Sequence, residues 1–103
     1  MNDVLDDFLK RQSGVVLVNL WEDYTEACSL MEKVMKQLEA VMGSTMHILR
    51  LPMSENRKWA EQFRVRGTPS VLVFRDGKLV AKFRGRLEYK EMVNKLRELG
   101  LMI

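Results

Sequence analysis

The feature that most constrains the fold is the segment Val15–Trp21, VVLVNLW, which is apolar at every position except Asn19. A strand that is apolar on both faces is covered by helices on both sides, whereas a strand with one wet face alternates apolar and polar residues. From Ala27, apolar residues recur at helical spacing up to Gly43, and glycine commonly ends a helix. A two-sided strand followed by an amphipathic helix predicts a layered α/β domain.

The rest of the chain continues this alternation of helices and strands. The sequence predicts a helix over Asp3–Arg11, strands over Thr45–Leu51, Ser70–Phe74 and Lys78–Arg84, a helix that is capped by Ser54 and buries Trp59, Ala60 and Phe63, and a last helix over Glu88–Leu99. Asp76-Gly77 is a strong hairpin signal between the last two strands. The expected architecture is therefore α/β/α in three layers, around a mixed sheet of about four strands with an antiparallel C-terminal hairpin. Four methionines fall in the helical stripes and are expected to fill the core: Met31, Met35, Met42 and Met92.

Composition indicates one domain over residues 1–103. The chain is 47% hydrophobic and has only 6 Gly and 2 Pro, with no linker or repeat. Its apolar runs are too short to span a bilayer, and its acidic N-terminus lacks the apolar core of a signal peptide. A single cysteine fits a reducing compartment, so we expect a cytoplasmic protein with no membrane partner.

Charge is divided unevenly along the chain. Residues 1–49 hold four Lys/Arg and eight Asp/Glu, and residues 50–103 hold thirteen and six, for net charges of −4 and +7. The basic residues are spread over several elements without interleaved exposed aromatics, which favours a solvated surface over a nucleic-acid site. The single histidine, His47, has no nearby companion ligand, so no metal site and no cofactor are predicted.

Three features of the sequence occur together: the element order, a Trp and a Cys in WEDYTEAC at the start of the long helix, and the later segment VRGTPSVLVFRDGK. In these features the chain resembles thioredoxin over nearly its whole length. The resemblance implies a cis Thr68–Pro69 peptide bond facing the redox motif, and Gly85 in the loop that forms the third wall of the site. It also implies a groove that holds an extended peptide, running from Trp21 and Tyr24 to Thr68, Pro69 and Gly85. The strand that usually precedes the family's first helix is missing here.

Three positions depart from the family pattern. The family's first motif cysteine falls on Thr25, so the motif is Thr25-Glu26-Ala27-Cys28, with Ala27 in place of the motif proline. The family's buried acid falls on Asn19. A dithiol cycle needs an attacking and a resolving thiol, and a threonine hydroxyl replaces neither. A conventional protein disulfide oxidoreductase activity is therefore not expected.

The remaining motif residues favour a stable helix start. Thr25 stands at the expected N-cap, where its hydroxyl accepts a hydrogen bond from the backbone N–H of Cys28. Glu22, Asp23 and Glu26 place negative charge at the positive helix end, which favours the helix and disfavours a thiolate at Cys28. Cys28 is interpreted first as a small packed side chain, and alternatively as a working thiol that is oxidised or forms a mixed disulfide with an external thiol.

Arginines surround a groove that is mostly apolar in the family. Arg66 precedes the proline loop, and Arg84 and Arg86 flank Gly85. Two alternatives stay open: these arginines form ion pairs with Glu22, Asp23 and Glu26 that close the groove, or they bind an acidic peptide or ligand.

Two functions follow from these observations. The first is a module that binds a protein or peptide partner beside the cis-proline, in a chaperone-like or assembly role. The second is a single-thiol redox protein that uses Cys28 with an external thiol in cell redox homeostasis.

Without the family's first strand, the strand at 45–51 is expected at a sheet edge. Two alternatives follow for this edge: a homodimer formed by strand pairing, or an edge protected by Arg50 and Pro52, which is favoured.

Overall fold

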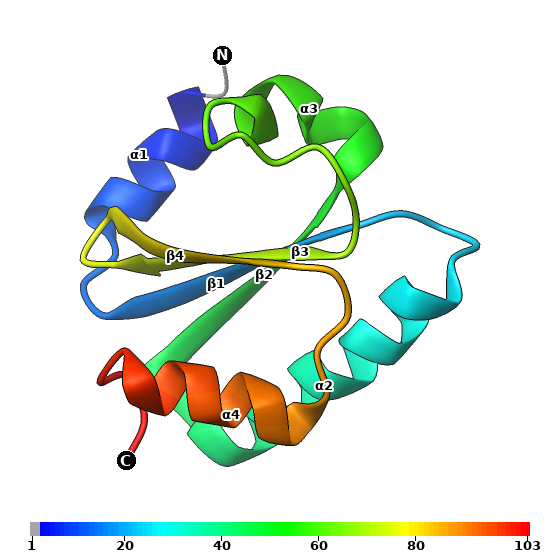
Figure 1. Ribbon diagram of the computed structural model, residues 1–103. Coiled ribbons are helices and arrows are strands. Elements are labelled where there is room, and N and C mark those ends of the chain that lie inside the picture. Colours follow the sequence, from blue (N-terminus) through cyan, green and yellow to red (C-terminus); the bar gives the residue numbers. More distant parts are fainter. Residues whose placement is uncertain (1–2) are drawn as a thin grey trace.

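The computed structural model describes residues 3–103, and at its centre lies one sheet with the strand order β2-β1-β3-β4 (Figure 1). β1 and β2 are parallel, and the other neighbouring strands are antiparallel. The strands and helices are α1 (Asp3–Arg11), β1 (Val15–Trp21), α2 (Glu26–Met42), the 3₁₀ turn η1 (Gly43–Thr45), β2 (Met46–Pro52), α3 (Met53–Glu61), β3 (Ser70–Arg75), β4 (Lys78–Arg84) and α4 (Tyr89–Glu98). The predicted α/β architecture, with its mixed sheet and C-terminal hairpin, is confirmed.

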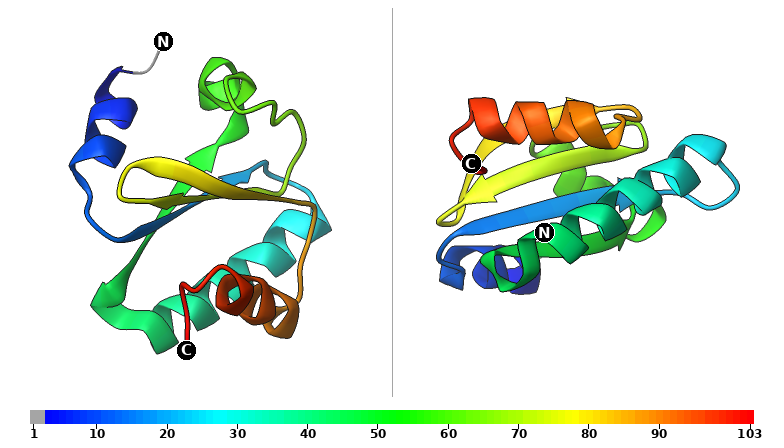
Figure 2. Two further views of the ribbon diagram at one scale, coloured as in Figure 1. Left: turned by 60° about the vertical axis from the view of Figure 1, so that its left-hand side comes forward. Right: turned by 90° about the horizontal axis from the view of Figure 1, so that it is seen from below.

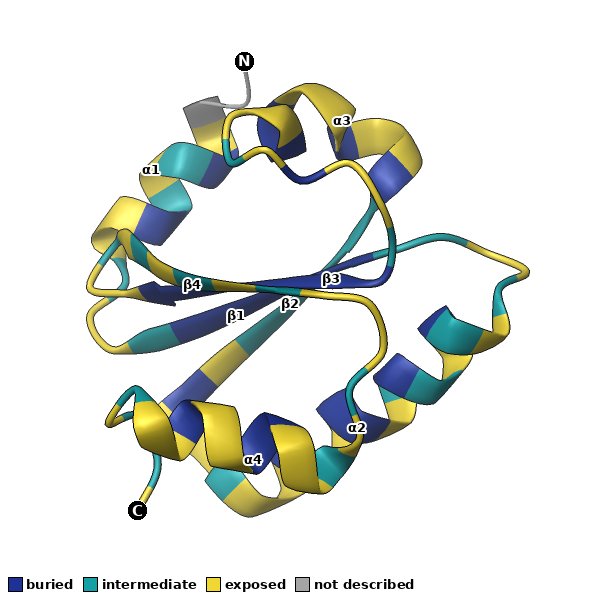
Figure 3. Ribbon diagram, in the orientation of Figure 1, coloured by how far each residue is buried: buried dark blue, intermediate teal, exposed yellow. Residues whose placement is uncertain are grey.

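The helices cover both faces of the sheet. α1 and α3 lie on one side and α2 and α4 on the other, and Figure 2 shows α2 and α4 next to each other over the same face. This arrangement follows from alternation along β1: Val16, Val18 and Leu20 belong to an apolar cluster with α1 and α3, and Leu17 belongs to one with α2 and α4. The central strands are therefore buried on both faces, while exposed residues gather on the outer helix faces and the loops (Figure 3).

The methionines in the helical stripes belong to the cluster on the α2 and α4 side. Met31, Met35 and Met92 are fully buried, and the half-buried Met42 packs against them. These side chains fill irregular spaces between helix and sheet, as expected.

An irregular pairing in the hairpin places Leu79 and Ala81 of β4 on opposite faces of the sheet. Val73 pairs with Ala81 and Phe74 pairs with Leu79, so Val80 is the extra residue of a β-bulge. As a result, Leu79 packs with the α1 and α3 cluster, while Ala81 lies in the other cluster.

The predicted hairpin turn is confirmed at Asp76 and Gly77, whose φ angles are 50° and 83°. Asp76 Oδ1 accepts a hydrogen bond from the Gly14 backbone N–H at 2.7 Å, which ties the hairpin to the start of β1. A Cβ at position 77 would lie 3.1 Å from the Cα of Lys10, so both the close approach and the positive φ require glycine here.

The start of α3 differs from the prediction. β2 continues through Pro52, which itself occupies the N-cap position, and α3 begins at Met53, so Ser54 is not the cap. Asn56 has non-helical angles (φ −132°, ψ 20°) and its Nδ2 donates to the Pro52 carbonyl at 2.8 Å, which closes the turn instead. Phe63 lies beyond the end of α3, where its ring packs edge-on against Trp59 with centroids 4.9 Å apart.

The last helix is slightly shorter than predicted and has a defined start. Glu88 is its N-cap and forms a capping box with Glu91, whose Oε1 accepts from the Glu88 backbone N–H at 3.1 Å. β2 lies at an edge of the sheet, as expected. That this edge is protected, in preference to forming a homodimer, stays a prediction.

Candidate functional site

The segments singled out by the sequence lie at one end of the sheet. The strand register aligns Leu20 with Ser70 and Ser70 with Arg84. The loop after β1, the residues before β3 and the residues after β4 therefore meet at this end. The Thr68–Pro69 bond is cis, as the resemblance implied, and the Gly85 backbone N–H donates to the Pro69 carbonyl at 2.8 Å.

The start of α2 is built by Thr25. Its backbone is extended (φ −114°, ψ 133°), and its Oγ1 accepts a hydrogen bond from the Cys28 backbone N–H at 3.2 Å. This is the predicted N-cap, and it satisfies one of the unpaired N–H groups of the first turn. Tyr24, just before it, has a φ of 64° and a fully exposed side chain. Glu26 is the exposed acid of the first turn, and Ala27 is half-buried.

Cys28 is buried inside the first turn of α2. Its side chain is 5% exposed, and its Sγ accepts a hydrogen bond from the Glu22 backbone N–H at 3.5 Å. The chain contains no second cysteine, so an internal disulfide cannot form.

A cavity of about 480 Å³ lies against Cys28 on the α2 side of the sheet. Asn19 lines it and is 1% exposed, and neither polar atom of its side chain makes a hydrogen bond within residues 3–103. A carboxylic acid at this position accepts and returns a proton, whereas an amide does not titrate. The position that the resemblance assigns to a buried acid therefore holds no base.

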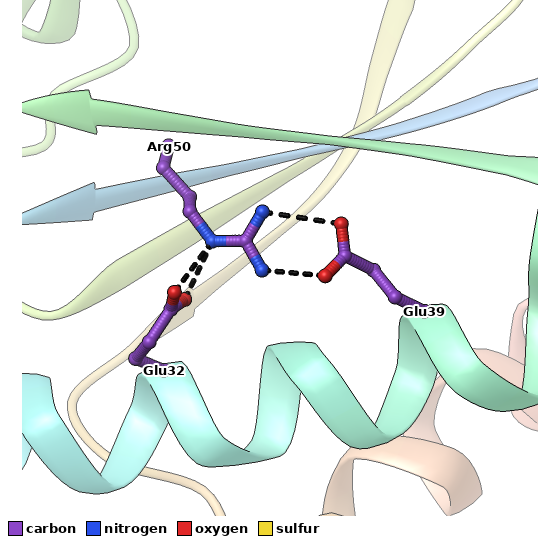
Figure 4. A network of polar contacts seen from close by, with 3 residues as sticks. All are labelled: Glu32, Glu39 and Arg50. Carbon is purple, nitrogen blue, oxygen red and sulfur yellow. Dashed lines mark hydrogen bonds and ion pairs between the residues drawn. The ribbon is translucent and has the colours of Figure 1, made fainter.

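Arg50 closes the flank of this cavity, which Glu32 and Lys33 also line. Arg50 Nε donates to both carboxylate oxygens of Glu32 at 2.6 and 2.7 Å, and its Nη1 and Nη2 donate to Glu39 at 3.1 and 2.7 Å (Figure 4). The fork geometry of the guanidinium suits two carboxylates at once. Hydrogen bonding from Arg50 lowers the pKa of Glu39, and the two glutamates raise the pKa of Arg50. The network ties β2 to α2 rather than shielding the free edge of β2.

The lowered pKa of Glu39 makes part of the stability pH-dependent. The stabilisation is fully present above the ordinary glutamate pKa of the unfolded chain and is lost as pH falls through the lower folded-state pKa. We expect Glu39→Gln to reduce the free energy of unfolding by at most about 1 kcal/mol near neutral pH, because the pair is partly exposed. The difference from wild type is expected to disappear in urea unfolding experiments once the pH lies below the lowered folded-state pKa of Glu39.

Glu61→Gln is the matched control, since Glu61 is exposed and forms no ion pair within residues 3–103. If the difference in the free energy of unfolding between Glu39→Gln and wild type stays unchanged in acid, the stabilisation does not come from the ionised Glu39 carboxylate.

A second cavity, of about 640 Å³, lies beside the cis-proline on the α3 side of the sheet. Its lining consists of three arginines and the loop residues around Pro69: Arg64, Arg66, Gly67, Thr68, Pro69, Ser70, Arg84 and Gly85. No hydrogen bond within residues 3–103 uses the backbone N–H or C=O of Thr68. Trp21 and Tyr24, in contrast, line the cavity beside Cys28. The structure thus divides the expected groove residues between two cavities at the same end of the sheet.

Of the three arginines singled out by the sequence, Arg66 and Arg84 line this second cavity and Arg86 does not. Arg86 lies 3.8 Å from a carboxylate oxygen of Glu88 instead. Arg64, which the sequence reasoning missed, completes the set.

Ion pairs across the groove, one of the two alternatives, are not formed within residues 3–103. Glu22 pairs with Arg57 of α3 at 3.7 Å, and neither Asp23 nor Glu26 takes part in an ion pair within the same residues. The cavity arginines therefore keep their charges without a carboxylate partner from that part of the chain.

Comparison with known proteins agrees with this geometry. The thioredoxin family model matches residues 2–98. The chain belongs to the thioredoxin family. It is 31% identical to thioredoxin from Bacillus subtilis (strain 168) over 85 residues, which cover 80% of this chain and 82% of that protein. It is 35% identical to thioredoxin from Staphylococcus saprophyticus over 74 residues (72% and 71%), and 34% identical to thioredoxin from Staphylococcus aureus (strain N315) over 76 residues (74% and 73%).

This thioredoxin-family chain thus keeps the scaffold and carries a single thiol, without a Cys-x-x-Cys pair. Among the side chains of residues 4–103, no group of three or more His, Cys, Asp or Glu is placed to hold a metal ion. None of the helices over those residues is long and apolar enough to cross a membrane.

Proposed function

We propose that this thioredoxin-family protein binds a protein partner as an extended segment beside Pro69, in a chaperone-like or assembly role, with little or no redox catalysis. The observation that carries the proposal is the contrast between the two sides of the site. Cys28 is buried and has no partner thiol in the chain, whereas the cavity beside Pro69 is lined by Thr68, whose backbone makes no hydrogen bond with the described residues, and by three arginines that form no ion pair with them. Since a lone free cysteine suits a reducing compartment, we also propose that the protein works in the cytoplasm.

The backbone of Thr68 supports this mode of binding. Its N–H and C=O make no hydrogen bond within residues 3–103, and the adjacent Pro69 carbonyl is held by Gly85. An extended peptide binds to such free backbone groups in the way that a strand adds to a sheet, and this needs no sulfur. Thr68 therefore stands as the residue to which the partner's main chain binds.

The second candidate is a single-thiol redox protein. It draws support from the cavity of about 480 Å³ that reaches Cys28. In this function the Cys28 thiolate attacks oxidised glutathione, a protein–glutathione disulfide forms, and one glutathione leaves as thiolate. A second external thiol then attacks the mixed disulfide and restores Cys28.

The reactivity of Cys28 separates the two functions. We expect oxidised glutathione to modify the native protein on the order of 100-fold more slowly than the protein in denaturant, because a side chain that is 5% exposed reacts mainly through local opening. The measurement is the mass of intact protein over time at neutral pH. Rapid stoichiometric modification of the native protein would falsify the partner-binding proposal in favour of the single-thiol function.

The control is Thr25→Ser, which keeps a hydroxyl at the N-cap and so preserves the helix start around Cys28. Thr25→Ala is expected to raise the native modification rate, because the helix end loses about 1 kcal/mol and opens more often.

A further inference from the structure

Three arginines gather around the cavity beside Pro69. Arg64 and Arg66 come from the segment between α3 and β3, and Arg84 ends β4. Side chains alternate along β4, so Lys82 and Arg84 both face the turn that follows α3. In that turn, Lys82 Nζ donates to the Phe63 carbonyl at 2.9 Å, and Arg84 Nη2 donates to the Arg64 carbonyl at 3.5 Å. The hairpin thus brings cations over the turn that follows α3.

The charges of this cluster are not neutralised within the cavity. No acidic residue lines it, and none of the three arginines takes part in an ion pair among the side chains of residues 4–103. Arg50, Arg57 and Arg86 each have a carboxylate partner, whereas Arg11, Arg75 and Arg97 share with the cavity arginines the lack of an ion pair among the described side chains; what distinguishes Arg64, Arg66 and Arg84 is that they line one cavity together. Like charges around a hollow reinforce one another and concentrate a positive potential there.

We propose that this cavity, here called the arginine cavity, selects partner segments that are acidic: an extended peptide whose carboxylates bind Arg64, Arg66 and Arg84 while its main chain binds Thr68. This inference rests on the proposed function and names the chemistry of the partner. Alternate side chains of an extended peptide point to the same face, so a segment with Glu or Asp at every second position presents a row of carboxylates to the guanidinium groups.

The backbone of Arg64 offers a way to separate binding from folding. Its φ of 60° lies in the left-handed region, where glycine is the residue without steric cost. Arg64→Gly therefore removes one charge from the cavity and is expected to leave the melting temperature unchanged or higher. The carbonyl that accepts from Arg84 is retained.

The test compares three peptides of equal length: Glu-Thr-Glu-Val-Glu-Thr, its neutral counterpart Gln-Thr-Gln-Val-Gln-Thr and its basic counterpart Lys-Thr-Lys-Val-Lys-Thr. Binding to the full chain is followed by calorimetry and by the amide NMR signals of Thr68 and Gly85. We expect the acidic peptide to bind about tenfold or more tightly than the neutral one, the basic peptide not to bind, and the preference to weaken with added salt.

Variants assign the preference to the arginine cavity. Arg66→Gln, Arg84→Gln and Arg64→Gly are each expected to weaken acidic-peptide binding about three- to fivefold, and the double variant Arg66→Gln/Arg84→Gln about tenfold or more. Arg75→Gln is the matched control, because Arg75 is also exposed but lies at the opposite end of the sheet, where β3 pairs with Val15 of β1. Loss of affinity in Arg75→Gln as large as in Arg84→Gln means that only net charge matters, which overturns the proposal.

The remaining outcomes distinguish this inference from the function on which it rests. If the acidic and neutral peptides shift the amide signals of Thr68 and Gly85 with equal affinity, the acidic preference is wrong and the proposal of peptide binding stands. If no peptide shifts these signals, both proposals are wrong. If inorganic phosphate at matched ionic strength displaces the acidic peptide completely, the cavity is a small-anion site and not one for an acidic partner segment.

Discussion

Thr25→Cys is expected to convert the protein into one that forms an internal disulfide and reduces insulin. The introduced thiol stands at the N-cap of α2, three residues before Cys28, where the helix dipole favours a thiolate and the neighbouring acids Glu22, Asp23 and Glu26 oppose it. It attacks the insulin disulfide and forms a mixed disulfide, Cys28 then attacks that bond, and reduced insulin leaves while both protein sulfurs join. An external reductant restores the dithiol.

The size of this effect comes from holding two thiols together. Resolution by a neighbouring thiol is intramolecular, so we expect insulin reduction at a rate on the order of tenfold or more above that of wild type. The rate is measured by insulin precipitation in the presence of dithiothreitol, and the disulfide by the loss of two hydrogens in the intact mass. The reduced variant is expected to be about 1 kcal/mol less stable than wild type, since the Thr25 cap is lost.

Two variants complete this experiment. Thr25→Ser keeps the cap and adds no sulfur, so it should behave as wild type. Thr25→Cys combined with Cys28→Ser has one thiol at the exposed position and should form mixed disulfides that are not resolved. Wild-type protein that reduces insulin as fast as Thr25→Cys, without any further polypeptide, contradicts our account of the site.

The second large effect is expected on stability, from Trp59→Ala. Trp59 is 2% exposed, its ring contacts Phe63 and Phe74 with centroids 4.9 and 6.1 Å away, and its Nε1 donates to Asp6 Oδ1 at 3.0 Å. Truncation opens a cavity between α3 and the sheet and removes the hydrogen bond that joins α3 to α1. We expect a loss of about 3–5 kcal/mol in the free energy of unfolding.

Such a loss is a large part of the total of about 5–15 kcal/mol that is usual for proteins of this kind. It is measured by urea unfolding followed by circular dichroism. Trp59→Phe keeps one aromatic ring but loses the second ring and the N–H donor to Asp6, so its expected cost is smaller, about 1–2 kcal/mol. Equal losses in the two variants would show that the hydrogen bond, and not the packing, dominates at this position.

Much of the fold was predictable from short-range signals. The two-sided apolar character of Val15–Trp21 predicted helices on both faces of the sheet, and Asp76-Gly77 predicted a turn that needs positive φ at both residues. The Thr25 cap was predictable because it depends only on residues three apart. In each case the deciding interaction is local or follows from alternation along one element.

What escaped prediction depends on register between distant segments. Arg50 meets Glu32 and Glu39 only because β2 pairs in parallel with β1 and turns that side chain toward α2. The alternation of β2 and the seven-residue spacing of the two glutamates on α2 were the signals that could have revealed this network. Arg64 was missed because its place in the arginine cavity follows from a left-handed turn after α3, which no glycine marks.

The two cavities at the same end of the sheet are built from different residues. Asn19 and Cys28 line the cavity against α2, whereas the arginine cavity lies beside Pro69, and the two cavities have no lining residue in common. Free-energy effects of substitutions that share no contacts usually add. We therefore expect that a thiol pair can be rebuilt beside Asn19 without changing the lining of the arginine cavity.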